Sequence, residues 1–300
     1  GSEMCIRDRL YIGKREEVFV YNESTGNFDL FYHLAGKDIT LSCLHLDEKK
    51  NLWMGTAGKG VYRLSEDKTI SRPVTEGNIT SIYEDSSKEL WIGSWEEGLY
   101  RVKPDGSIEN FRHDPKNANS LCSDFVRSFC EDNSGNLWIG TFHGLNRYEK
   151  STGNFQLYTA NASKPDGLTH SSIWCIVKDG QGTLWLGTYF GGVNYFNPEY
   201  EIYTRYKVGD TEKEGLSSPI VGRMTEDKDG NLWICTEGGG VNVYNRKDNT
   251  YRWYRHEEGK NSISHNNVKA IYYDQAHDIM WIGTHLGGLN KLDLRTNRFT

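Results

Sequence analysis

The 300-residue sequence has few of the features that mark membrane proteins, nucleic-acid-binding proteins or multidomain chains. No apolar run approaches the ~18 residues that a membrane-spanning helix needs, so no membrane contact is expected from this fragment. Lys and Arg form no basic cluster and the net charge is −6, so nucleic acid is not an expected partner. Only 6 prolines occur, which predicts few rigid linkers between domains.

Cysteine is also sparse. The 6 cysteines are widely and irregularly spaced, and none forms a C-x-x-C pair. Such spacing supports neither a disulfide framework nor a zinc site. We expect them to be small buried hydrophobic residues, and we predict no metal and no cofactor. They are Cys5, Cys43, Cys122, Cys130, Cys175 and Cys235.

Aromatic residues are abundant, at 13%, and the tryptophans define an internal repeat. Six segments share the pattern Leu-Trp-Ile-Gly-Thr with small variations, as in residues 137–141, and a degenerate seventh copy begins at Leu10. Successive copies are 38 to 48 residues apart, and an Asp stands six residues before the Trp in five of them. The anchor residues are Tyr11, Trp53, Trp91, Trp138, Trp185, Trp233 and Trp281.

Each repeat predicts four short β-strands. A short apolar run ends in the Asp, a polar turn leads to the Trp strand, and a Gly-rich turn leads to a third strand and then a fourth. Four strands in a period of roughly 40–50 residues, without helical periodicity, are typical of propeller blades. The sequence therefore predicts an all-β, seven-bladed β-propeller of four-stranded antiparallel blades. The Gly after each Trp is expected where the backbone of a neighbouring blade comes close.

The two ends of the repeat predict an incomplete ring. Residues 1–9 fit no repeat and are interpreted as a cloning scar and a non-repeat leader, and residues 10–300 as one propeller domain. No room is left for a strand before Tyr11, and the fourth strand of the last unit only begins near Thr300. The seam between the first and last blades is therefore expected to be incomplete, with exposed edges that make a homodimer a candidate assembly.

The repeated Gly-Asn-Leu-Trp-Ile-Gly-Thr-x-x-Gly-Gly-Leu/Val-Asn-x-Tyr resembles the two-component regulator propeller repeat, and the resemblance covers nearly the whole chain from Leu10 onward. That family mostly forms the periplasmic sensor region of hybrid two-component histidine kinases in Bacteroidetes-type gut bacteria. The resemblance implies a periplasmic domain for signal transduction that senses a glycan or oligosaccharide without catalysis. Family members add a second propeller, a Y-shaped β domain, a transmembrane helix and kinase modules, none of which is expected within these residues.

A recognition face is predicted on the side that carries the turn after each Trp strand. Turns on the other side are repetitive, whereas the residues four and five positions after the anchors vary. In a closed ring these would surround the mouth of the central channel, where aromatic faces can pack on sugar C–H groups and polar groups can bond hydroxyls. For the aromatic residues, packing between blades is the alternative. The candidate ligand-binding residues are Arg15, Trp95, Glu96, Phe142, His143, Tyr189, Phe190, Glu237 and His285.

The linkers between blades on this face become long in the later repeats. They share a Ser/Gly-Leu/Ile-Ser/Thr core, so we expect them to be ordered, with the aliphatic residue inserted between blades. These linkers are residues 115–123, 164–170, 214–218 and 260–265.

Two other function classes stay open, and no catalytic residue is assigned. Propellers also host glycoside hydrolases and lyases, and a hydrolase needs two facing carboxylates about 5–10 Å apart. Glu97 joins Glu96 and Glu237 as a candidate for that role, and His143 or His285 with Arg15 could serve a lyase. The third class is a protein-interaction or dimerisation platform, which a flat apolar patch on the rim would favour.

Overall fold

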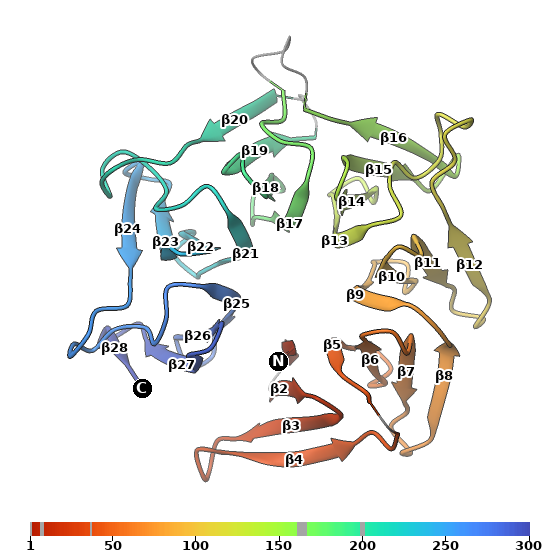
Figure 1. The fold of residues 1–300 in the computed structure, drawn as a ribbon, viewed down its shortest axis with the longest axis horizontal. Coiled ribbons are helices and arrows are strands. Elements are labelled where there is room, and N and C mark those ends of the chain that lie inside the picture. The colour runs from red at the N-terminus through yellow and green to blue at the C-terminus, as the bar shows by residue number, and fades with distance from the viewer. Residues whose placement is uncertain (1, 7–8, 37, 161–166, 199–201) are drawn as a thin grey trace.

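The protein is a ring of seven four-stranded antiparallel sheets (Figure 1). Each sheet is one blade, with its first strand at the centre of the ring and its fourth at the periphery. The predicted all-β, seven-bladed propeller is confirmed. Turns and loops join the described strands. Within the described residues, the structure contains no helix that could span a membrane. The computed structural model describes residues 2–6, 9–36, 38–160, 167–198 and 202–300.

The blades take their strands in chain order. Blades 1 to 3 comprise β1 (Ser2–Ile6), β2 (Arg9–Lys14), β3 (Glu17–Asn22), β4 (Asn27–His33); β5 (Leu41–Leu46), β6 (Leu52–Thr56), β7 (Val61–Leu64), β8 (Ile70–Val74); and β9 (Asn78–Glu84), β10 (Leu90–Trp95), β11 (Leu99–Val102), β12 (Ile108–Phe111). Blades 4 and 5 comprise β13 (Val126–Glu131), β14 (Leu137–Thr141), β15 (Leu145–Glu149), β16 (Asn154–Tyr158); and β17 (Ile173–Lys178), β18 (Leu184–Thr188), β19 (Val193–Asn197), β20 (Ile202–Tyr206). Blades 6 and 7 comprise β21 (Val221–Glu226), β22 (Leu232–Thr236), β23 (Gly240–Asn245), β24 (Thr250–Tyr254); and β25 (Val268–Asp274), β26 (Ile279–Thr284), β27 (Gly288–Asp293), β28 (Arg298–Phe299).

The first blade has a strand that the sequence analysis did not expect. β1 pairs with β2 in antiparallel register from Ser2 opposite Gly13 to Ile6 opposite Arg9, so the expectation that no strand precedes Tyr11 is wrong. The physical reason is that two antiparallel strands can be joined by as few as two residues, so a very short leader suffices. At the last blade the expectation holds, since β28 spans only Arg298–Phe299.

The seam between blades 7 and 1 is closed by side chains. Trp281 of β26 packs edge-on against Tyr21 and Phe28 of blade 1, with ring centroids 5.1 and 6.4 Å apart. Leu10 of β2 is buried in the same cluster as Ile279 of β26. Every blade consists of four consecutive strands, so hydrophobic packing across this seam joins the first blade to the last.

The hydrophobic core lies between neighbouring blades. The Trp strand of each repeat is almost entirely buried, as shown by β14, in which all five residues are buried. Its Trp138 packs in one cluster with Ile176 and Leu186 of blade 5. One blade alone would expose this apolar face, so each blade depends on its neighbour for burial.

The glycine in four of the Trp strands admits the next blade. A Cβ on Gly187 would lie 2.8 Å from Cγ1 of Val221 in blade 6 and 2.7 Å from Sγ of Cys175 in its own blade. The glycine thus marks a close approach as predicted, but the approaching group is an aliphatic side chain and the predicted backbone contact is wrong. The same relation joins Gly55 to Ile79, Gly93 to Val126 and Gly140 to Ile173.

Buried aspartates close the turns before the Trp strands. The Asp132 carboxylate accepts the indole N–H of Trp138 at 2.8 Å and the backbone N–H groups of Ser134 and Asn136, both at 2.9 Å. One side chain therefore shapes the turn and also orients the ring that fills the core. The same indole bond, also 2.8 Å long, joins Asp47 to Trp53, Asp85 to Trp91, Asp179 to Trp185 and Asp227 to Trp233.

The described parts of the long linkers are held as the sequence predicted, and residues 164–166 lie outside the described part of the chain. The aliphatic residue of each is buried, and an Asn on the third strand of the same blade accepts the N–H of the residue that follows it, as Asn146 does from Cys122 at 2.9 Å. The four buried aliphatic residues are Leu121, Leu168, Leu216 and Ile263.

The cysteines behave as the hydrophobic residues that the sequence analysis expected. Four are buried and free, and Cys122 is free and partly buried. The side chain of Cys5 lies outside the described part of the chain. The four buried ones are Cys43, Cys130, Cys175 and Cys235.

The substitution Asp132→Ala tests the aspartate. It leaves the indole N–H of Trp138 and two backbone N–H groups without their acceptor, so we expect the free energy of unfolding to fall by about 2–4 kcal/mol. Urea unfolding measures this change. Asp105→Ala is the control, because Asp105 makes a similar turn bond to Ser107 but is exposed. A loss at Asp132 no larger than at Asp105 would contradict the proposed role.

The substitution Gly187→Ala tests the close approach between blades 5 and 6. Its Cβ would overlap Val221 and Cys175, so we expect a loss of about 1–3 kcal/mol in thermal or urea unfolding. Gly180→Ala is the matched control, because a Cβ there meets nothing nearer than 3.8 Å. Equal stability of the two variants would show that blades 5 and 6 can admit the extra Cβ without a loss in the free energy of unfolding.

Candidate functional site

The inner strands of six blades carry a β-bulge at corresponding positions. In β13, Val126 pairs with Thr141 and Ser128 with Gly140, which leaves Arg127 as the extra residue. A bulge of this kind re-aims one side chain out of the regular alternation. The bulged residues are Ser42, Thr80, Arg127, Trp174, Gly222 with Arg223, and Lys269.

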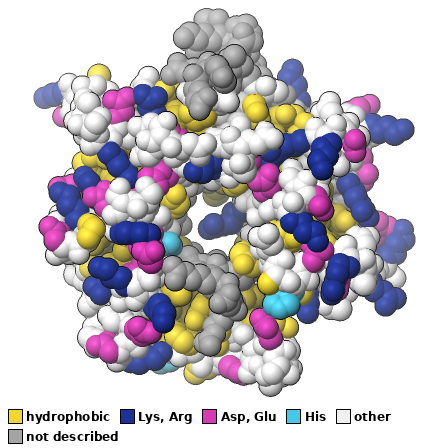
Figure 2. Space-filling view, turned by 180° about the vertical axis from the view of Figure 1, so that it is seen from behind, with side chains coloured by type: hydrophobic (Ala, Val, Ile, Leu, Met, Phe, Trp, Pro, Cys, Tyr) yellow, Lys and Arg dark blue, Asp and Glu magenta, His cyan; other side chains and the backbone are white. Residues whose placement is uncertain are grey.

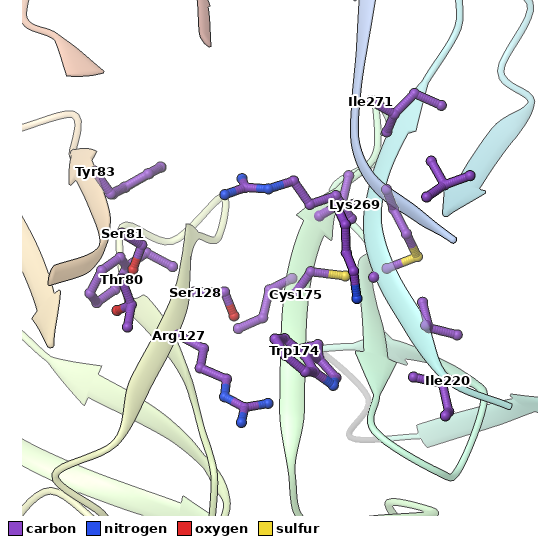
Figure 3. Close-up of a pocket in the computed structure, with 18 of the residues that line it drawn as sticks. Thr80, Ser81, Tyr83, Arg127, Ser128, Trp174, Cys175, Ile220, Lys269 and Ile271 are labelled. Atoms are coloured by element: carbon purple, nitrogen blue, oxygen red, sulfur yellow. The ribbon is translucent and has the colours of Figure 1, made fainter. Parts of the chain in front are cut away.

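Most of these residues line a cavity of about 540 Å³ in the central channel. Figure 2 shows the opening of the ring from one face, with Lys or Arg side chains inside it. Figure 3 shows Arg127, Trp174 and Lys269 on three different strands around this space. The volume suits a small ligand of a few sugar units rather than a macromolecule. Polar and charged lining residues include Thr80, Ser81, Tyr83, Arg127, Ser128, Arg223, Glu237 and Lys269, and the lining aromatic residues include Trp95, Phe129 and Trp174.

Arg127 lies in an aromatic cage at the wall of this cavity. Its guanidinium carbon is 3.8 Å from the ring centre of Trp174 and 5.0 Å from those of Trp95 and Phe142. Nε and Nη1 are buried and have no hydrogen-bond partner among the described residues. Burial lowers the pKa of the Arg127 guanidinium to about 10, and Tyr189 opposes that effect. The cation is thus held by ring faces, with donors that the described residues leave unused.

Further aromatic rings extend the cage on both sides. Trp95 packs edge-on against Phe125 at 5.0 Å, and Phe142 lies 5.1 Å from His143. On the other side, Trp174 lies 5.7 Å from Tyr189, which contacts Phe190 at 4.4 Å. Blades 3, 4 and 5 therefore share one aromatic wall, and Phe190 remains 56% exposed at its end.

The opposite side of the cavity carries charge. The Lys269 ammonium group is 3.2 Å from the Glu237 carboxylate. Arg223 is exposed and has no ion-pair partner within 4.0 Å among the described residues. Burial raises the pKa of the Cys43 and Cys175 thiols to about 12, and the charge of Arg223 opposes this in both. Arg223 lines the cavity from β21 of blade 6.

The structure brings together part of the predicted set. Trp95 and Glu237 line the cavity, Phe142 contacts Arg127, and His143, Tyr189 and Phe190 continue the wall. The remaining three predicted residues are exposed and are not among those that line it. They are Arg15, Glu96 and His285.

Sequence reasoning missed the bulged residues, above all Arg127 and Trp174. A signal for them exists, because they stand eleven residues before the anchor Trp, directly after an aliphatic residue at or near the start of the inner strand. The residues at this position of the repeat are Ser42, Thr80, Arg127, Trp174 and Gly222. In the last repeat, Lys269 stands twelve residues before Trp281. It varies within an otherwise repetitive segment, as a recognition position would.

Comparisons with known proteins agree with this architecture. The family model of the two-component regulator propeller matches residues 73–96, 120–143, 167–190 and 215–238. No curated protein matches the chain. The protein is therefore a seven-bladed β-propeller whose central channel holds a ligand-sized cavity. Four of its repeats match the two-component regulator propeller repeat, as the sequence motif indicated.

Several solved structures share the fold. The extracellular domain of the proposed one-component system BT4673 of B. thetaiotaomicron is 20% identical with a TM-score of 0.51, over 100% of this chain and 48% of that one. PorZ of Porphyromonas gingivalis is 16% identical with a TM-score of 0.73, over 96% and 46%. Virginiamycin B lyase of Staphylococcus aureus is 14% identical with a TM-score of 0.72, over 97% and 93%. The chain spans about half the length of the first two.

The substitution Arg127→Met tests whether the caged cation is retained for stability. The substitution replaces a partly buried, unpaired charge by an apolar side chain of similar length, so we expect stability to stay equal or to rise by about 1 kcal/mol. Thermal unfolding measures this. Arg101→Met is the contrast, because Arg101 also stacks on a Trp but pairs with buried Glu89, so that variant is expected to lose about 2 kcal/mol. A similar loss in both variants would mean that Arg127 is structural.

Proposed function

We propose that this propeller is the ligand-sensing domain of a two-component signalling system, and that it binds an oligosaccharide in its central channel without chemically changing it. The single observation that carries the proposal is the aromatic cage. Trp174 and Trp95 hold Arg127 at the cavity wall with donors that no described residue accepts. Ring faces for sugar C–H groups, beside donors for hydroxyls, are what carbohydrate recognition requires.

The repeat family and the related structures support a sensor on the outside of the cytoplasmic membrane. The family model is that of a two-component regulator propeller, and BT4673 is described as having an extracellular domain. We infer a periplasmic location from these names and from the sequence resemblance. The chain spans about half of that domain, so the signalling partner and the kinase are also part of the proposal.

An enzymatic function is the second candidate, and one observation favours keeping it. A lyase, virginiamycin B lyase, shares the fold over nearly its whole length. The candidate carboxylates for a hydrolase are Glu96, Glu97 and Glu237. No contact between described residues brings two of them together as a facing pair. Glu97 pairs with Arg112 in blade 3. Glu237 of blade 6 pairs with Lys269 of the neighbouring blade 7. Blades 6 and 7 lie on the opposite side of the ring from blade 3 (Figure 1). The sensor is therefore the better-supported function.

A platform for protein interaction or dimerisation is the third candidate. A flat apolar patch on the rim is the feature that would favour this function. Among the residues whose side chains the structure describes, the exposed large hydrophobic residues of the outermost strands are Leu30, Ile70, Ile108 and Leu157, each on a different blade. This scattered arrangement gives dimerisation less support than the channel gives to ligand binding.

Calorimetric titration against a panel of oligosaccharides tests the proposal. We expect at least one glycan to bind, and the double variant Trp95→Ala/Tyr189→Ala to lose that binding because the aromatic wall is removed. The sugar should be recovered intact. The matched control is Trp253→Ala, which removes an indole from the outer strand β24.

Each outcome has a definite reading. Cleaved sugar would replace the sensor with the enzymatic function. Binding that survives the double variant would place the ligand away from the channel. An absence of binding across the panel would contradict the proposed function for this chain.

A further inference from the structure

The cavity has more positive than negative charge. Among the lining residues that the structure describes, Arg127, Arg223 and Lys269 are cationic and Glu237 is the one anion. Glu237 is bonded to Lys269 at 3.2 Å, so one cation is already compensated. Two guanidinium groups remain without a carboxylate within 4.0 Å in the described part of the chain. This contrasts with the overall chain, whose net charge is −6.

Three of the four other arginines that lie on core tryptophans pair with an acid, whereas the fourth, Arg63 on Trp53, donates to the Asn51 side chain. Arg101 stacks on Trp91 and pairs with Glu89, and Arg246 stacks on Trp185 and pairs with Asp179 and Glu226. Arg127 keeps the stacking but has no acid beside it. An unpaired charge that is partly removed from water costs free energy, and a bound anion would offset that cost.

The position of Arg127 also suits an anion. Its guanidinium lies at the channel wall beside Trp174, as Figure 3 shows. A guanidinium presents donors in a planar fork that matches the two oxygens of a carboxylate or sulfate. Arg223 adds a second, exposed cation on β21, on the far side of the cavity from Trp95. A ligand with an anionic group on a ring-shaped body would use the fork and the aromatic wall together.

We propose that the channel selects an acidic oligosaccharide, one whose sugar units carry a carboxylate or a sulfate group, with Arg127 and Arg223 as the anion-binding residues. The inference rests on the proposed function, because it names the class of glycan for that same cavity. Neutral glycans are expected to bind less well, since they leave both guanidinium groups without a counter-charge.

The test compares matched glycans by calorimetry on the intact chain. The probes are tetragalacturonate, its fully methyl-esterified form, and a sulfated carrageenan tetrasaccharide. We expect at least one acidic probe to bind roughly tenfold or more tightly than the neutral ester, and added NaCl to weaken that binding. The carboxylated and sulfated probes distinguish the two sources of the anion.

Two variants locate the effect. Arg223→Gln, at an exposed side chain that the fold does not need, should weaken acidic binding roughly tenfold and change neutral binding little. Arg252→Gln removes the same charge from the outer strand β24 and should leave both unchanged. Circular dichroism confirms that each variant is folded.

The failures can be told apart. If a neutral glycan of the panel binds as tightly as the acidic probes, the anion preference is wrong while the sensor function stands. If acidic binding persists unchanged in Arg223→Gln and in Arg127→Met, the anion lies elsewhere and the inference is wrong. If neither acidic nor neutral glycans bind, both this inference and the proposed function fail.

Discussion

The hydrogen bond from a tryptophan indole to a buried aspartate is the interaction on which the rest of the structure depends. In five blades the indole N–H lies 2.8 Å from the carboxylate that also closes the preceding turn. The bond couples the local geometry of a hairpin to the orientation of a ring that packs against the next blade. Blade 7 departs from the pattern, because Asp274 stands one residue further from Trp281 and bonds His277 instead.

Because the core of five blades is fixed in this way, the inner strand can vary at one place without loss of the fold. The bulge gives that place a side chain that points into the channel, and the repeats supply Thr80, Arg127, Trp174 and Lys269 there.

Blade 6 shows the same tolerance in the core. Its Trp strand has Cys235 where the other repeats have Gly, and Gly222 lies opposite, where an added Cβ would be 3.4 Å from Cβ of Cys235. Blade 5 has the reverse pair, Cys175 opposite Gly187.

The sequence predicts the ring well because its signals are local and repeated. The Trp anchors, the Asp turns and the buried linker residues such as Leu121 all follow from short patterns. The first strand was missed because residues 2–6 carry no anchor and pair only with β2. Only part of the lining of the candidate site could be predicted from the sequence. Trp95 and Glu237 follow from the loop after each anchor, whereas Arg127 and Trp174 depend on a bulge, which is visible only once two strands are paired in register.

Fluorine NMR of the chain labelled with 5-fluorotryptophan tests the central claim, that the channel is the ligand site, most directly. Trp174 and Trp95 line the cavity, whereas the indoles of Trp91 and Trp138 are bonded inside blades. On addition of tetragalacturonate, the account predicts shifted resonances for Trp174 and Trp95 and unchanged ones for Trp91 and Trp138. Shifts confined to Trp253 on the outer strand β24, with the channel indoles unchanged, would contradict it.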